Sequence, residues 1–111
     1  KLVESMRGLR TRVDKYAKEA GLDQIITISA DEWGLGSPWL LTGFGTVHAM
    51  FAAALLGSVV RNAEALGVAF TNYFEVINEG GIKVHPFTSE LTPVGEALAL
   101  YAKHQGHGQI P

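Results

Sequence analysis

One arrangement of residues occurs twice in this chain of 111 residues and limits what the chain can fold into. In "AKEAGLDQIITIS" (17–29) and again in "AEALGVAFTNY" (63–73), a helical pattern is followed by a glycine and then by β-forming residues. A glycine just after a helix usually adopts the left-handed cap conformation. Each copy therefore predicts a helix, a tight turn at Gly21 or Gly67, and a strand. Helices that alternate with strands through short loops are typical of parallel α/β proteins.

Hydrophobic periodicity and turn residues extend this prediction over the whole chain. The helices are expected at 2–20, 45–66 and 93–105, and the strands at 24–29 and 68–72. The first strand, Gln24 to Ser29, is rich in β-branched residues and is expected to be buried on both faces, as in parallel sheets. The third helix is expected to begin after Thr92 as its N-cap and to be closed by Gly106.

The predicted elements do not make a self-sufficient fold. Two strands are too few for a parallel sheet with both faces covered, and the helices are too apolar for so small a sheet. The chain also begins at Lys1, already inside a helical pattern. We therefore expect residues 1–111 to be a single fragment of a larger α/β structure that is incomplete alone.

Composition excludes several classes of function. An apolar fraction of 47% and a charged fraction of 18% describe a folded globular protein. A net charge of −2 with scattered signs argues against binding to nucleic acid or to an anionic membrane. No continuous apolar run reaches the roughly 18 residues that cross a bilayer, and the lack of cysteine excludes disulfides and thiolate metal sites. No signal peptide opens the chain, so the cytoplasm is favoured over secretion although the compartment is not fixed.

Polar and aromatic residues gather where both predicted strands end. Asp31-Glu32-Trp33 follow the first strand, and Asn72 to Glu75 end the second. Because the carboxyl ends of parallel strands share one rim, these groups are expected to lie on the same side of the sheet. A carboxylate beside an indole suits a sugar site, with stacking for the ring and charge for an oxocarbenium-like transition state. The alternative is that these acids are only solvated strand ends.

The same residues carry a family resemblance. The strand ending in "DEW", the long apolar helix, "NYFEVIN" and "TPVGEALALYAKHQG" resemble the last third of a clan A glycoside hydrolase barrel. The chain is most similar to the family 51 α-L-arabinofuranosidases, in which an acid or threonine, the nucleophilic glutamate and a tryptophan end the seventh strand. The resemblance puts Glu32 in the nucleophile's place and Glu75 in that of a substrate-contacting glutamine. Gly34 departs from the usual asparagine, and residues 80–90 have no close counterpart.

The resemblance implies a fold, an activity and a set of site residues. The chain would be the last portion of a (β/α)8 TIM barrel, with strands seven and eight and their flanking helices. It would belong to a retaining glycoside hydrolase acting on α-L-arabinofuranosides in plant-type polysaccharides. The acid/base glutamate belongs on the fourth strand, in the missing rest of the barrel, so the fragment alone is expected to be inactive. The residues expected to bind the carbohydrate are Trp33, Trp39, Asn72, Glu75 and His48.

Other interpretations stay open. The chain could be a non-catalytic α/β interaction module that self-associates as a homo-oligomer, or part of another clan A glycosidase with a different sugar. Adjacent strand residues point to opposite faces, so only one of Asp31 and Glu32 can face the site. Asp31 is therefore expected to stabilise the end of the strand or an adjacent loop. No pair of the four histidines has the spacing of one helical face that metal ligands use, so neither a metal nor a cofactor is expected.

Overall fold

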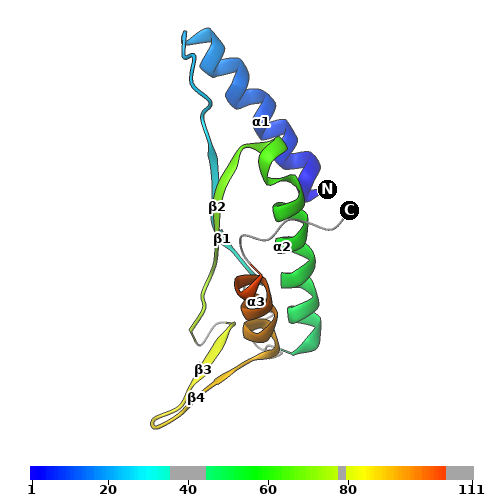
Figure 1. Cartoon of the computed structure of the whole chain (residues 1–111), viewed down its shortest axis with the longest axis vertical. Helices are drawn as coiled ribbons and strands as arrows, with labels where there is room; N and C mark the ends of the chain where they lie inside the picture. The colour runs from blue at the N-terminus through cyan, green and yellow to red at the C-terminus, as the bar shows by residue number, and fades with distance from the viewer. Residues whose placement is uncertain (36–44, 78–79, 105–111) are drawn as a thin grey trace. The chain divides into compact units, whose positions relative to one another are not determined.

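The computed structural model describes residues 1–35, 45–77 and 80–104. These residues are mixed α/β (Figure 1), with helices α1 (Leu2–Glu19), α2 (Thr46–Leu66) and α3 (Pro93–Lys103) and strands β1 (Ile28–Trp33), β2 (Val68–Tyr73), β3 (Ile82–Val84) and β4 (Ser89–Leu91). The chain divides into two compact units. The first comprises 1–33 and 55–72, the second comprises 34–54 and 73–111, and α2 contributes to both.

Strands β1 and β2 form the sheet of the first unit. The backbone N–H of Ile28 donates to the carbonyl oxygen of Gly67 at 2.8 Å, where both strands begin. The strands then run in the same direction (Figure 1), so the sheet is parallel. In a parallel ladder this bond sets Ile28 opposite Val68, and every later pair follows in step.

The two glycines of the repeated sequence end their helices as predicted. Gly21 and Gly67 have φ angles of 70° and 64°, in the left-handed region where a side chain is strained. After α1 the N–H of Leu22 bonds to the carbonyl of Ala17 at 2.9 Å, and the N–H of Gly21 bonds to that of Lys18 at 3.1 Å. This is the Schellman pattern, which satisfies carbonyls that the helix end leaves unpaired.

The predicted position of the first strand is wrong. Its β-branched residues 24–27 are not in a strand, Ile25 is 82% exposed, and β1 instead contains Asp31-Glu32-Trp33. The reason is the position of its partner, because β2 begins only after Gly67 and leaves the earlier residues without a neighbour to pair with. Burial on both faces is also wrong, since Ser29 and Asp31 are exposed.

The second unit contains a hairpin that the sequence interpretation missed. Strands β3 and β4 pair antiparallel, with Ile82 opposite Leu91 and Lys83 opposite Glu90. The four-residue turn between them is closed by a bond from the N–H of His85 to the carbonyl of Thr88 at 2.8 Å. Proline at the second turn position and the opposite charges across the strands are signals that favour such a hairpin.

Helix α3 begins as predicted. Thr92 is the N-cap, its hydroxyl accepts a hydrogen bond from the N–H of Gly95 at 3.1 Å, and Pro93 occupies the first turn. The helix ends at Lys103, two residues before the predicted end, and Gly106 lies outside the described residues. In the same unit, the Tyr101 hydroxyl donates to the carbonyl of Ala53 in α2 at 3.0 Å.

Helix α2 has an apolar sequence, and three of its buried residues are regularly spaced along it. Ala52, Val59 and Leu66 are spaced seven residues apart and are almost wholly buried. By length and composition alone α2 could also cross a membrane, a property that core helices of soluble proteins share. The buried stripe is what a helix packed within an α/β protein requires.

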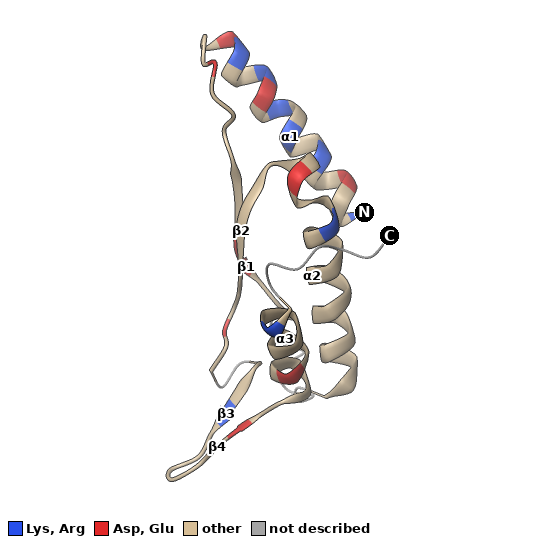
Figure 2. Cartoon of the chain, viewed as in Figure 1, with Lys and Arg blue, Asp and Glu red and all other residues tan. Residues whose placement is uncertain are grey.

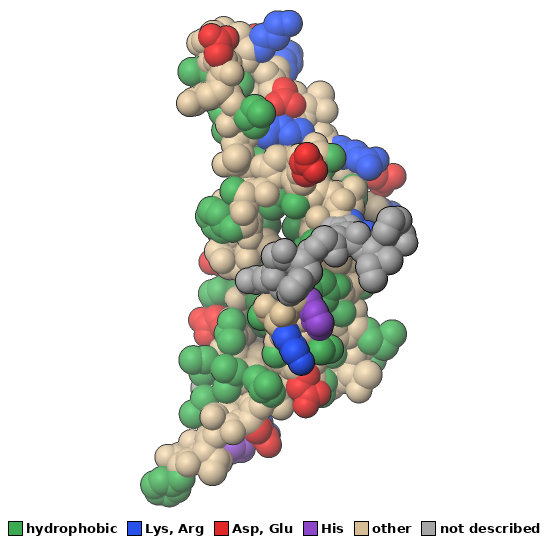
Figure 3. Space-filling model, viewed as in Figure 1, with side chains coloured by type: hydrophobic (Ala, Val, Ile, Leu, Met, Phe, Trp, Pro, Cys, Tyr) green, Lys and Arg blue, Asp and Glu red, His purple; other side chains and the backbone are tan. Residues whose placement is uncertain are grey.

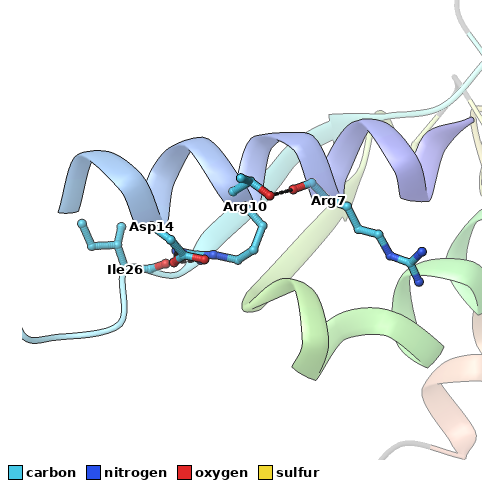
Figure 4. A network of polar contacts seen from close by, with 5 residues as sticks. Arg7, Arg10, Asp14 and Ile26 are labelled. Carbon is cyan, nitrogen blue, oxygen red and sulfur yellow. Dashed lines mark hydrogen bonds and ion pairs between the residues drawn. The ribbon is translucent and has the colours of Figure 1, made fainter. Parts of the chain in front are cut away.

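Arg10 of α1 connects three parts of the first unit (Figure 4). Its guanidinium donates to the carbonyl of Ile26 at 2.5 Å and to the carboxylate of Asp14. It also lies against Gly67, where an added Cβ would stand 2.9 Å from the Arg10 Nη1. The largely buried Arg10 side chain therefore connects α1 with the segment before β1 and with the turn before β2.

We expect Arg10→Ala to lower the free energy of unfolding by about 2 kcal/mol, because a bond from a charged donor to a carbonyl is lost. Arg10→Lys should restore only part of the lost free energy of unfolding. The lysine ammonium lacks the planar guanidinium geometry that lets Arg10 donate to both the Ile26 carbonyl and the Asp14 carboxylate. Asp14→Ala is the matched control: Asp14 is exposed, so its removal should change stability by less than about 1 kcal/mol. Urea unfolding followed by circular dichroism measures all three, and equal losses in Arg10→Ala and Asp14→Ala would contradict the prediction.

Candidate functional site

The parallel register places Glu32 directly opposite Asn72. The bond from Ile28 to Gly67 aligns the starts of β1 and β2, and both strands continue for six residues. Four residues further on, the ladder therefore pairs Glu32 with Asn72. Paired residues in a parallel ladder point to the same face, so the carboxylate and the amide share one side of the sheet.

This shared face is partly exposed, and apart from Glu32 and Asn72 it is apolar. By alternation it carries Ile28 and Ala30 from β1 and Val68 and Phe70 from β2. Phe70 is 54% exposed, and Glu32 and Asn72 at the carboxyl end are exposed as well. The face thus consists of apolar side chains, of which only Phe70 is exposed, with one exposed carboxylate and one exposed amide at its carboxyl end.

The opposite face of the same sheet is also partly exposed, because Ser29, Asp31 and Ala69 are exposed whereas Trp33, Thr71 and Tyr73 are half-buried. It carries Trp33 and Thr71, and the indole nitrogen and the hydroxyl oxygen of these two side chains are buried. The Thr71 hydroxyl has no hydrogen-bond partner among the described residues. Neither face of the two-stranded sheet is fully covered.

The adjacent acids of the "DEW" sequence are separated by this alternation. Glu32 lies on the face that carries Asn72, whereas Asp31 points to the same side as Trp33. Both carboxylates are exposed. Trp33 was expected to bind substrate together with Glu32, but the structure does not bring the two side chains onto one face. Its contact with a sugar stays a prediction.

The other predicted site residues belong to the second unit or cannot be placed. Trp39 lies outside the described residues. His48 is buried in the first turn of α2, and Glu75 is exposed just after β2, where the Phe74–Glu75 peptide bond is cis. Substrate binding by these residues stays a prediction.

Gly34 stands in a position that has no room for a side chain. A Cβ at this position would stand 2.5 Å from the carbonyl oxygen of Phe74, which is inside van der Waals contact. An asparagine therefore does not fit beside this backbone as it stands. Gly34 permits the segment after β1 to pass close to the segment after β2.

Tyr73 is a residue that the sequence interpretation did not single out. Burial raises the pKa of its phenol above the ordinary value, so the hydroxyl is neutral at physiological pH. The ring fits against Gly80, where an added Cβ would overlap it. The glycine pair after β2 was the available signal for such a close approach. A neutral phenol packed on glycine is a structural group rather than a base.

The face of the sheet that carries Asn72 thus offers one exposed carboxylate, that of Glu32, with a neutral amide on the neighbouring strand. Among the described residues no three His, Asp or Glu side chains form a group that could hold a metal ion. Such a site can supply a carboxylate nucleophile or base, and an amide that both donates and accepts hydrogen bonds. Comparisons with protein-family models, with curated proteins and with solved structures find no match to this chain.

Proposed function

We propose that this chain carries the nucleophile of a retaining glycoside hydrolase and that Glu32 is that nucleophile. The observation that supports this most is the pairing of Glu32 with Asn72 at the carboxyl end of two parallel strands. Functional groups of parallel α/β enzymes gather at this end of the sheet. The resemblance of the surrounding sequence to family 51 makes an α-L-arabinofuranoside the proposed substrate.

The apolar residues that share a face with Glu32 support a barrel as the complete fold. A TIM barrel has an interior filled by layers of side chains, in which branched apolar residues dominate. Ile28, Val68 and Phe70 would belong to such layers, with Glu32 above them at the catalytic end. Residues 1–111 would then supply strands seven and eight, and the remaining strands would complete the barrel.

The chemistry assigns one role to this chain and one to the rest of the barrel. An oxygen of Glu32 attacks the anomeric carbon while the bond to the leaving oxygen breaks. That oxygen takes a proton from a second carboxylic acid about 5 Å from Glu32. Water then hydrolyses the glycosyl ester, and the second carboxyl group accepts its proton. Asp31 does not serve as this acid, because it points to the opposite face of β1.

Covalent trapping tests the proposal on the full-length natural protein. An activated 2-deoxy-2-fluoro-α-L-arabinofuranoside slows hydrolysis of the glycosyl ester more than its formation, so the intermediate should accumulate. Peptide mass spectrometry should then find the sugar on residues 28–33, and fragmentation should assign it to Glu32 rather than Asp31. Labelling of another carboxylate together with inactivation would overturn the assignment of Glu32.

A non-catalytic interaction module is the second candidate, and exposed apolar side chains favour it. Val47 and Met50 in the first turns of α2 are 76% and 67% exposed, and Phe87 at the tip of the β3–β4 hairpin is 99% exposed. Figure 3 shows apolar side chains at the surface of both places. A stable dimer that neither hydrolyses nor is labelled by the arabinofuranoside would favour this module over the enzyme.

A further inference from the structure

The backbone hydrogen bonds of the β3–β4 hairpin can be assigned to particular residue pairs. The N–H of His85 donates to the carbonyl of Thr88 at 2.8 Å, so these two residues form a hydrogen-bonded pair. Such pairs alternate along an antiparallel ladder, and the register makes Lys83 with Glu90 the next one. Within β4, the backbone groups that point toward β3 are therefore those of Glu90.

The other edge of β4 is open. The N–H and carbonyl groups of Ser89 and Leu91 point away from β3, and they bond to no residue that the structure describes. All three residues of β4 are exposed. On the β3 side of the hairpin, by contrast, the outward N–H of Ile82 already donates to the carbonyl of Val76 at 2.7 Å. The β4 edge is thus the place where a further strand can add to this hairpin.

We propose that the β4 edge pairs with the β4 edge of a second copy of the chain, antiparallel and about a two-fold axis at Ser89. Each Ser89 N–H donates to the carbonyl of the partner's Ser89, and Leu91 lies opposite the partner's Phe87. Phe87 is 99% exposed and Leu91 is 51% exposed, so this pairing removes apolar side chains of both copies from water. A second copy supplies the matching apolar residue by symmetry, which is the self-complementarity that a two-fold interface requires.

The charge on β4 selects this register among the two-fold axes that pass through a residue of the strand. Glu90 is the charged residue of β4, and Lys83 opposite it lies on β3 (Figure 2). An axis at Glu90 would set two carboxylates directly opposite each other, which destabilises a strand pair. An axis at Leu91 would set Ser89 opposite the partner's Pro93, which belongs to α3 and has no N–H to donate. The axis at Ser89 avoids both conflicts.

Disulfide cross-linking tests the register in the full-length natural protein. Directly opposed residues of a hydrogen-bonded pair have Cα atoms about 5.5 Å apart, within the span of a disulfide. Ser89→Cys should therefore give a disulfide-linked dimer under mild oxidation, with residue 89 joined to residue 89 in peptide mass spectrometry. Glu90→Cys is the matched control, because the two positions 90 are then diagonal neighbours about 8 Å apart, too far to be bridged. A Ser89→Cys protein that cross-links no faster than Glu90→Cys would overturn the proposal.

Sedimentation over a range of concentrations measures the dimer without a cross-link. Ser89→Pro removes the outward N–H and leaves the bonds between β3 and β4 intact, so the Kd of the dimer should rise about tenfold or more. Ser89→Ala keeps the N–H and should leave the Kd nearly unchanged, and circular dichroism checks that both variants are folded. Equal dimerisation of the two variants would contradict the proposed pairing. The dimer does not depend on the proposed glycosidase function, since Glu32→Ala should dimerise like the unmodified protein.

Discussion

Replacing Glu32 by alanine in the full-length protein is expected to lower kcat for 4-nitrophenyl α-L-arabinofuranoside by about 10⁴-fold or more, the scale seen when a covalent nucleophile is removed. The loss should lie in kcat rather than in KM, because the proposed nucleophile would act on the transition state rather than on ground-state binding. Stability should change little, since Glu32 is exposed and lies at the end of a strand.

Two further measurements separate loss of the nucleophile from loss of the fold. Azide is a small anion that fits the space left by the carboxylate, so it should restore turnover in Glu32→Ala and yield the glycosyl azide. Asp31→Asn is the matched control: it removes a carboxylate one residue away on the other face and should leave kcat nearly unchanged. A large decrease of kcat in Asp31→Asn, together with an active Glu32→Ala, would assign the nucleophile to Asp31 instead of Glu32 and contradict the proposed site.

The helix boundaries could be predicted from sequence because their signals are local. The left-handed glycines at Gly21 and Gly67 and the N-cap at Thr92 each depend on a few neighbouring residues, and all three were predicted correctly. The end of α3 was placed two residues too late, which is the ordinary uncertainty where a helix frays.

The strand that carries the site was harder to predict because strand limits depend on a partner. The β-branched residues 24–27 have the stronger propensity, but only residues from Ile28 onward meet β2. The hairpin was missed for a related reason, since its three-residue strands are too short for a clear alternating pattern.

The site itself could be predicted in part. Polarity at strand ends led to Glu32 and Asn72, which the structure places opposite each other near the ends of β1 and β2, but their part in a functional site stays a prediction. The face on which Trp33 lies, and the direct opposition of Glu32 and Asn72, required the register set by one backbone bond between Ile28 and Gly67. No local pattern in a single sequence contains that register, because it joins residues 39 positions apart by their numbers.

Replacing Gly95 by alanine is expected to destabilise the second unit by about 3 kcal/mol. Gly95 lies in the first turn of α3, where an added Cβ would overlap the carbonyl oxygen of Gly81. That carbonyl cannot easily move, because it accepts the N–H of Thr92 at 3.0 Å, and the Gly81 N–H is bonded to Val76 at 2.9 Å. The Thr92 hydroxyl adds further bonds to the carbonyls of Gly80 and Gly81.

A loss of stability in Gly95→Ala would indicate the close contact with Gly81, because replacing a glycine within a helix by alanine ordinarily raises the free energy of unfolding by about 1 kcal/mol. Gly8 in α1 provides the matched control, since nothing lies within 4 Å of a Cβ built there. Gly8→Ala should therefore raise the urea midpoint, whereas Gly95→Ala should lower it. The hairpin and α3 should lose their amide protection from hydrogen exchange in Gly95→Ala, because the contact that fails joins Gly81 before β3 to the start of α3. A Gly95→Ala protein as stable as the unmodified chain would show that α3 does not pack on Gly81.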